Sequence, residues 1–148
     1  MSDQLIGRPI EILLIEDNPG DARLTREAFK HGTVSSRLHS VGDGEEAIKL
    51  LRKEPPFDQV PRPDIIILDL NLPGRDGREV LAEIKNDPAL KRIPVIVLTG
   101  STADKDIADT YDNHANCFVA KPIELADYMS MLEAIESFWL ATVILPPE

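Results

Sequence analysis

The sequence predicts an α/β fold in which helices cover both faces of a five-stranded parallel sheet. Five short apolar segments alternate along the chain with five segments of helical periodicity. The third and fourth apolar segments also lack the polar alternation of a strand with one exposed face. Alternating strands and helices favour right-handed crossovers within one doubly wound sheet.

Five segments are predicted to be strands, and they lie at residues 10–15, 37–41, 65–68, 93–98 and 117–120. Residues 65–68 read Ile-Ile-Ile-Leu, an unbroken β-branched run that is typical of a strand buried on both faces. The first strand ends in Glu16-Asp17-Asn18-Pro19-Gly20, which is a turn and helix-cap signal.

Helices are predicted at residues 21–30, 76–85, 104–113 and 124–138, and one more carries Ala47, Ile48 and Leu51. Residues 54–63 contain four prolines and are expected to form an irregular loop. Because no repeat or low-complexity tract divides the chain, we expect one domain over residues 1–148, with a core at about 10–138 and an apolar tail at 139–148.

The composition excludes several classes of function. The formal net charge of −10 argues against a surface for nucleic acid or anionic lipid. Cys117 is the single cysteine, so the chain cannot form an internal disulfide, and we interpret Cys117 as a packing residue. No apolar run has the length of a signal peptide or a membrane span, and we expect a cytoplasmic protein. The three histidines, His31, His39 and His114, are scattered and receive no role.

Polar side chains follow four of the predicted strands. Glu16 and Asp17 follow the first strand, Asp69 the third, Thr99 the fourth and Lys121 the fifth. Each has an ordinary explanation when taken alone, as a turn, a cap or a loop residue. Ligand sites of open parallel sheets lie outside the carboxyl ends of the strands, so we expect these side chains to form one site.

The chemistry of these groups indicates a metal and a phosphoryl ligand. Three carboxylates brought together repel one another unless a cation compensates them. Magnesium suits such a site because it prefers oxygen ligands and leaves room for phosphate oxygens. A lysine ammonium and a threonine hydroxyl can donate to those oxygens. No histidine or cysteine stands at these strand ends, which argues against zinc.

The chain resembles a response-regulator receiver domain of the two-component systems from about residue 10 to residue 138. The motifs that carry the resemblance are Ile15-Glu16-Asp17-Asn18, Leu68-Asp69-Leu70-Asn71-Leu72-Pro73-Gly74, Leu98-Thr99-Gly100 and Lys121-Pro122. The resemblance implies a flavodoxin-like sheet with the strand order 2-1-3-4-5. It also implies a signalling switch that supports its own phosphorylation and dephosphorylation but is not otherwise an enzyme.

The resemblance assigns a role to each acidic residue. Asp69 is expected to be the phosphoacceptor. Asp17, Asp69 and the backbone carbonyl of Asn71 are expected to bind Mg²⁺ directly, and Glu16 mostly through a water molecule.

The same resemblance assigns the remaining site residues. Thr99 and Lys121 are expected to hold the phosphoryl oxygens, and Phe118 occupies the aromatic switch position. The Lys121-Pro122 peptide is expected to be cis. The chain departs from the commonest pattern in having Glu16 for aspartate, Phe118 for tyrosine and Gly100 for alanine, and none of these changes removes a required group.

The C-terminal third resembles the single-domain regulators that are paired with bacterial phytochrome kinases. The segments concerned are residues 115–118, Lys121-Pro122 and residues 135–140. The resemblance implies a sensor histidine kinase as partner. Only ten residues follow position 138, and none resembles a DNA-reading helix, so we expect signalling through protein contacts or onward phosphotransfer.

Two other functions compete with this interpretation. A phosphatase of the haloacid-dehalogenase type would place its nucleophile after the first strand and a second acid two residues later, whereas Asn71 stands two residues after Asp69. A flavodoxin-like redox module would need a phosphate-binding loop after the first strand, where Glu16 and Asp17 would repel a phosphate without a metal.

The last helix also predicts assembly. Leu125, Met129, Leu132 and Ile135 recur at helical spacing and are expected to cover the sheet. The apolar residues left over are expected to form an exposed interface of a homodimer, with the alternative that the tail folds back on its own domain. They are Tyr128, Met131, Phe138, Trp139, Leu140, Val143, Ile144 and Leu145.

Overall fold

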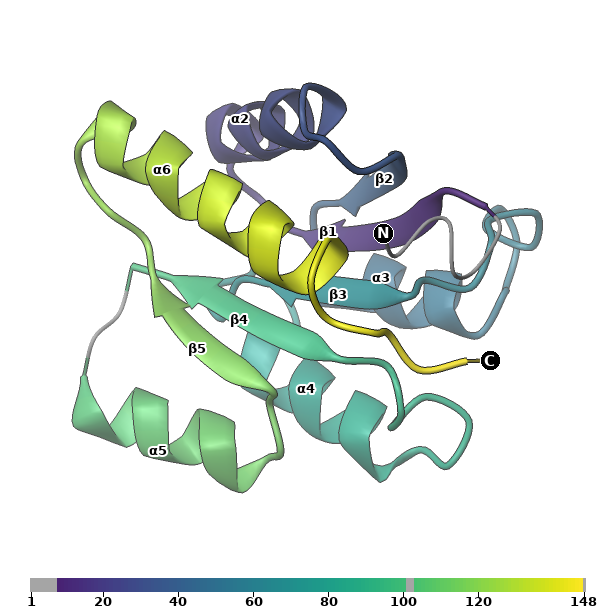
Figure 1. Cartoon of the computed structure of the whole chain (residues 1–148). Coiled ribbons are helices and arrows are strands. Elements are labelled where there is room, and N and C mark those ends of the chain that lie inside the picture. Colours follow the sequence, from purple (N-terminus) through teal and green to yellow (C-terminus); the bar gives the residue numbers. More distant parts are fainter. Residues whose placement is uncertain (1–7, 101–102, 148) are drawn as a thin grey trace.

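The computed structural model describes residues 8–100 and 103–147. Its five parallel strands form one sheet in the order β2-β1-β3-β4-β5, as Figure 1 shows. The strands are β1 (Ile10–Ile15), β2 (Ser36–Val41), β3 (Ile65–Leu68), β4 (Val95–Thr99) and β5 (Cys117–Ala120). The predicted fold class and strand order are confirmed.

Helices cover both faces of the sheet. In Figure 1, α2 and α6 lie on one face, and α3, α4 and α5 lie on the other. The helices are α2 (Pro19–Lys30), α3 (Gly44–Leu51), α4 (Gly77–Asn86), α5 (Asp104–Asp112) and α6 (Leu125–Ile135), and a π-helical turn η1 (Glu136–Leu140) continues α6. Within the described ranges, every helix is too short or too polar to traverse a bilayer.

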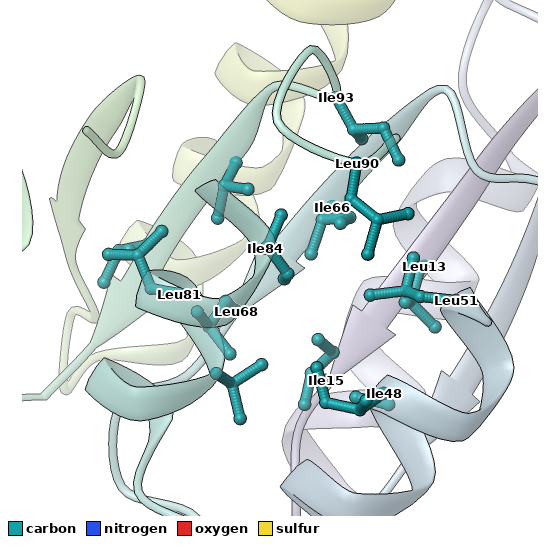
Figure 2. Packing of buried hydrophobic residues seen from close by; sticks show 14 of the residues in the cluster. Leu13, Ile15, Ile48, Leu51, Ile66, Leu68, Leu81, Ile84, Leu90 and Ile93 are labelled. Carbon is teal, nitrogen blue, oxygen red and sulfur yellow. The ribbon is translucent and has the colours of Figure 1, made fainter. Parts of the chain in front are cut away.

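Alternate residues of each central strand enter one of two hydrophobic cores. Leu13 and Ile15 of β1 pack toward α3 and α4, whereas Ile12 and Leu14 pack toward α2 and α6. Figure 2 shows the first core, in which Leu81 and Ile84 of α4 lie against the sheet. All four residues of β3 are buried, so both faces of the sheet are covered from solvent at its centre, as the unbroken apolar run predicts.

The first residues of two elements differ from the predicted ones by two positions, and the predicted helix 124–138 is α6 followed by the π-helical turn η1. Helix α2 begins at Pro19 because Asn18 caps it, with its side-chain oxygen accepting from the Asp21 backbone N–H at 3.0 Å. Strand β4 begins at Val95, after Pro94, whose nitrogen cannot donate to the ladder.

The prediction for the inward face of α6 was partly wrong. Leu132 and Ile135 are buried as expected, but Leu125 is 61% exposed, and Tyr128, expected outside, is buried. Apolar spacing gives the period of a helix face but not its phase. The phase of α6 follows from its approach to α2 and the sheet, which brings Tyr128 into the second core.

The C-terminal tail folds back on its own domain at two positions. Leu140 and Leu145 are buried in the core between α2, α6 and the sheet. The expectation that the whole tail is exposed was therefore wrong, and its alternative is confirmed for these two residues. Phe138 and Ile144 stay 56% and 77% exposed, so a smaller apolar surface remains.

Candidate functional site

The predicted site residues after β1, β3 and β5 lie together at the carboxyl end of the sheet. Carboxylate oxygens of Glu16, Asp17 and Asp69 lie within 4.8 Å of one another. Glu16 and Asp69 are buried at the ends of their strands, whereas Asp17 is exposed. The site thus has a buried floor and one open carboxylate.

The Lys121 ammonium lies among these carboxylates. Its Nζ donates to Glu16 Oε1 at 2.5 Å, to Asp69 Oδ2 at 2.9 Å and to Asp21 Oδ2 at 2.9 Å. One ammonium with three carboxylate partners leaves a net negative charge at the site. The arrangement therefore favours a further cation.

Burial and charge shift the pKa values of the site in a consistent way. Burial raises the pKa of Glu16 to about 7, although its contact with the Lys121 ammonium opposes the rise. Burial alone would lower the pKa of Lys121, but hydrogen bonds to Glu16, Asp69 and Asp21 outweigh it and raise that pKa above its ordinary value. Lys121 therefore keeps its positive charge at neutral pH. Additional positive charge beside Glu16 would favour the ionised form of its carboxyl group.

Asp69 is held in place by the start of α4. The Asn71 backbone N–H donates to Asp69 Oδ1 at 3.0 Å, and the Gly77 N–H donates to the Leu70 carbonyl at 3.0 Å. A Cβ on Gly77 would lie 2.5 Å from the Asp69 carbonyl oxygen and 2.5 Å from Leu70 Cα. Only glycine allows this close approach of the helix to the backbone of Asp69 and Leu70.

Thr99 and Phe118 lie on the β4 and β5 side of the site. Thr99 is fully buried, and its Oγ1 accepts from Asn71 Nδ2 at 3.3 Å. Phe118 packs half-buried against the first core, and its N–H donates to the Tyr111 hydroxyl at 3.2 Å. The first hydrogen bond thus joins the loop after β3 to the end of β4, and the second joins β5 to α5.

The Lys121-Pro122 peptide was expected to be cis, and this prediction was wrong. In the described part of the chain, the cis peptide is Pro55-Pro56. The trans form is the intrinsically favoured isomer of a bond before proline. Lys121 reaches its carboxylate partners from the trans peptide, and its N–H donates to the Thr99 carbonyl at 2.8 Å.

Sequence reasoning missed two residues of this site. Asp21 lies in the first turn of α2 and shares the Lys121 ammonium. Its place in the first turn of the helix that follows β1 was the available signal, because that turn lies next to the carboxyl end of the strand. Burial raises the pKa of Tyr128 in α6 to about 12, and the charges of Lys121 and Asp21 are close enough to influence its hydroxyl.

The site's donor atoms fit a hard divalent cation. The donor set consists of carboxylate oxygens, which Mg²⁺, Mn²⁺ and Ca²⁺ prefer over nitrogen or sulfur. Asp17 is exposed beside the buried pair of Glu16 and Asp69, so an ion bound there would keep an open side.

Comparison with known proteins decides the family. Residues 12–133 match the family model of the response regulator receiver domain. The chain belongs to the response-regulator receiver family. The receiver fold predicted from the residues is thereby confirmed, together with its place in two-component signalling.

Its relatives include regulators of phytochrome signalling. The receiver is 48% identical to the response regulator Rcp1 of Synechocystis sp. over 146 residues, which is 99% of either chain. The crystal structure of Mn²⁺-bound Rcp1 superposes with a TM-score of 0.91, covering 94% of this chain and 100% of that one. The phosphorylated cyanobacterial phytochrome response regulator RcpA, at 49% identity, also has a TM-score of 0.91 and covers 94% and 99% of the two chains.

A third neighbour is more distant. The bacteriophytochrome response regulator RtBRR is 33% identical, with a TM-score of 0.72 over 94% of this chain and 85% of that one. The predicted resemblance to phytochrome-linked regulators is confirmed by these relatives.

Proposed function

We propose that this receiver accepts a phosphoryl group on Asp69 from a phosphohistidine of a sensor kinase, with Mg²⁺ bound by neighbouring oxygens. The observation that supports the proposal most directly is the convergence of Glu16, Asp17, Asp69 and Lys121 within a few ångströms at the carboxyl end of the sheet. A carboxylate nucleophile beside fixed positive charge is what phosphoryl transfer requires.

In the proposed step, a carboxylate oxygen of Asp69 attacks the phosphorus of the phosphohistidine. A P–O bond forms, the P–N bond breaks, and the imidazole nitrogen leaves with the bonding electron pair. The Lys121 ammonium, 2.9 Å from Asp69 Oδ2, offsets the negative charge that arrives with the phosphoryl group. Bound Mg²⁺ would supply further charge neutralisation at the phosphoryl oxygens.

The other site residues receive supporting roles in this proposal. Asp17, Asp69 and the Asn71 carbonyl would hold the ion directly, and Glu16 would hold it mostly through water. Thr99 donates its hydroxyl to a phosphoryl oxygen, for which its buried position at the end of β4 is suited. Phe118 then moves further into the first core, where its ring is already half-buried.

The partner and the assembly are also proposals. We propose a bacterial phytochrome kinase as phosphodonor, because RcpA and RtBRR are phytochrome response regulators. We propose a single-domain cytoplasmic protein that forms a homodimer and binds neither nucleic acid nor membrane. The exposed side chains of Phe138 and Ile144 support the dimer.

Substitution of Asp69 tests the central proposal. Asp69→Asn is expected to abolish labelling by a phosphorylated kinase, because the amide keeps the shape but is not a nucleophile. Its melting temperature without Mg²⁺ is expected to stay level or rise, since one of the crowded carboxylates is removed. The assay is phosphotransfer from a radiolabelled kinase followed by gel separation. Wild-type labelling of the variant would falsify the assignment.

A small phosphodonor separates the receiver from the phosphatase alternative. Acetyl phosphate with Mg²⁺ is expected to give one stoichiometric adduct that resists acid and is released by hydroxylamine, as an acyl phosphate is. Sustained turnover of phosphate esters would instead favour an aspartyl-phosphate phosphatase.

A further inference from the structure

A groove lies away from the carboxylate site, between the C-terminal half of α2 and the outer strand β2. Its cavity has a volume of about 530 Å³. Its walls come from α2, from the loop that follows it and from β2, and they consist of Arg26, Phe29, Lys30, Gly32, Thr33, Val34, Ser35, Ser36 and Leu38. Asp21 of the carboxylate site lies in the first turn of α2, about 7 Å along the helix from Arg26 and about 14 Å from Lys30 of the groove.

The charge of this groove is opposite to that of the protein. Its charged lining residues are Arg26 and Lys30, and no carboxylate is among its described walls. The chain as a whole has a net charge of −10. The neighbouring cavity between α2 and α6 is lined instead by Glu27, Glu133 and Glu136. The groove therefore attracts an anionic partner that the rest of the surface repels.

One wall of the groove is an open sheet edge. Strand β2 is outermost in the sheet and pairs with β1 alone. The Ser35 carbonyl accepts from the Ile10 N–H, and the Val41 carbonyl accepts from the Glu16 N–H. The backbone groups of the odd-numbered residues of β2 therefore face β1. Along a parallel strand the backbone groups alternate between its two edges. Those of Ser36, Leu38 and Ser40 consequently turn outward.

Arg26 covers this edge. Its guanidinium donates to the Leu38 carbonyl at 3.0 Å and occupies an acceptor that an added strand would use. A charged side chain over an edge carbonyl discourages pairing with arbitrary strands. A carboxylate of a partner would compete with the Leu38 carbonyl for Arg26, because the guanidinium binds an anionic oxygen more strongly than a neutral carbonyl.

We propose that the β2 edge and this groove bind an extended acidic segment of a partner protein. The segment adds a strand to the sheet by hydrogen bonds to the outward backbone groups of Ser36, Leu38 and Ser40. Its carboxylates pair with Arg26 and Lys30, and Arg26 leaves the Leu38 carbonyl as it does so. The proposal is independent of phosphoryl transfer and concerns a separate surface of the protein.

The probe is a blocked hexapeptide that alternates glutamate with valine, titrated into the ¹⁵N-labelled full chain and followed by amide chemical shifts. We expect saturable shifts at Ser36, Leu38 and Ser40, and weakening by added salt. Arg26→Ala and Lys30→Ala should each reduce the affinity about two- to fivefold, as loss of an exposed charge pair does. Arg23→Ala is the matched control, since Arg23 is exposed on α2 outside the groove, and it should leave the affinity unchanged.

Three further ligands make the test decisive. A peptide with lysine in place of glutamate should not bind, and neither should the acidic peptide with every backbone amide methylated, which keeps its charges but cannot donate to the edge. Inorganic phosphate should not reproduce the β2 shifts. Equal binding of either control peptide, equal shifts with phosphate, or no β2 shift at about 5 mM acidic peptide would overturn the proposal. Unfolding midpoints of the variants confirm that each is folded.

Discussion

At the scale of single residues, the site depends on an excess of carboxylates over cations. Lys121 contacts Glu16, Asp21 and Asp69, and a carboxylate oxygen of Asp17 lies within 4.8 Å of those of Glu16 and Asp69. Burial is the main cause of the raised pKa of Glu16, and the neighbouring Asp69 carboxylate adds to the rise, while the contact with Lys121 opposes it. A divalent cation relieves the cost of ionising Glu16, and binding and stability are therefore coupled.

Added Mg²⁺ is expected to stabilise the protein. A ligand at ten times its dissociation constant adds about 1.4 kcal/mol to the free energy of unfolding, which corresponds to roughly 4 °C in melting temperature for a chain of this size. Asp17→Ala should remove most of this shift and Glu16→Ala a smaller part. The comparison is the shift within each variant, because Glu16→Ala also removes an ion pair with Lys121.

Asp112→Ala is the control for this experiment, as Asp112 is an exposed acid at the end of α5. It should retain the full shift. If neither Asp17→Ala nor Glu16→Ala changes the Mg²⁺ effect, the ion is not bound by these carboxylates.

At the scale of elements, close contacts between helix ends and loops support the sheet that carries the site. The first residue of α4, Gly77, packs directly on the backbone of Asp69 and Leu70. On the opposite face, buried Glu136 of η1 accepts from the Val34 N–H at 2.9 Å and ties the tail to the loop after α2. Each contact joins segments far apart in the sequence, so each is a point where one substitution disturbs two elements.

Gly77→Ala should destabilise the fold by about 1–3 kcal/mol, the usual cost of forcing extra atoms into a close-packed place. It should also reduce phosphoryl acceptance, because the Asp69 loop must move away from the new methyl group. Gly42→Ala is the control, since a Cβ there meets nothing within 4 Å. Urea unfolding and acetyl phosphate labelling measure the two effects, and equal stability of both variants would contradict the packing argument.

Glu136→Ala should cost about 1–3 kcal/mol, because it leaves the buried Val34 N–H without its acceptor. Glu133→Ala, an exposed glutamate one turn earlier, should stay within about 0.5 kcal/mol of the wild type. The midpoint of urea unfolding distinguishes them. A loss of the same size in both variants would show that charge alone, and not the tie to the loop, is responsible.

At the scale of the whole molecule, the tail is both part of the core and a candidate interface. Leu140 and Leu145 fill the second core, whereas Phe138 and Ile144 point outward. Truncation after Ser137 would therefore remove core residues together with the surface. Substitution of the exposed pair separates the two effects.

The double variant Phe138→Ser with Ile144→Ser should shift the proposed homodimer toward monomer while keeping the unfolding midpoint close to that of the wild type. Each exposed side chain contributes apolar area to the contact and little to the fold. Sedimentation velocity at micromolar concentration, with and without a phosphoryl mimic, measures the change. A wild-type protein that remains monomeric at high concentration would end the dimer proposal.

The fold class, the strand order (through the family resemblance) and the residues at the strand ends could all be predicted from the sequence. Strand-length apolar runs and the polar residues that end them are local signals, and the carboxyl ends of parallel strands necessarily meet. The predicted gathering of Glu16, Asp17, Asp69 and Lys121 followed from that rule, and the structure shows it.

Four features could be read only from the three-dimensional structure: the phase of α6, the course of the tail, the isomer at Lys121-Pro122 and the contact of Asp21 with Lys121. Each depends on how one element approaches another, and spacing along a chain carries no such information. The burial of Tyr128 in place of Leu125 illustrates the reason. Both residues belong to apolar sets of helical period, and packing against α2 and the sheet selects between them.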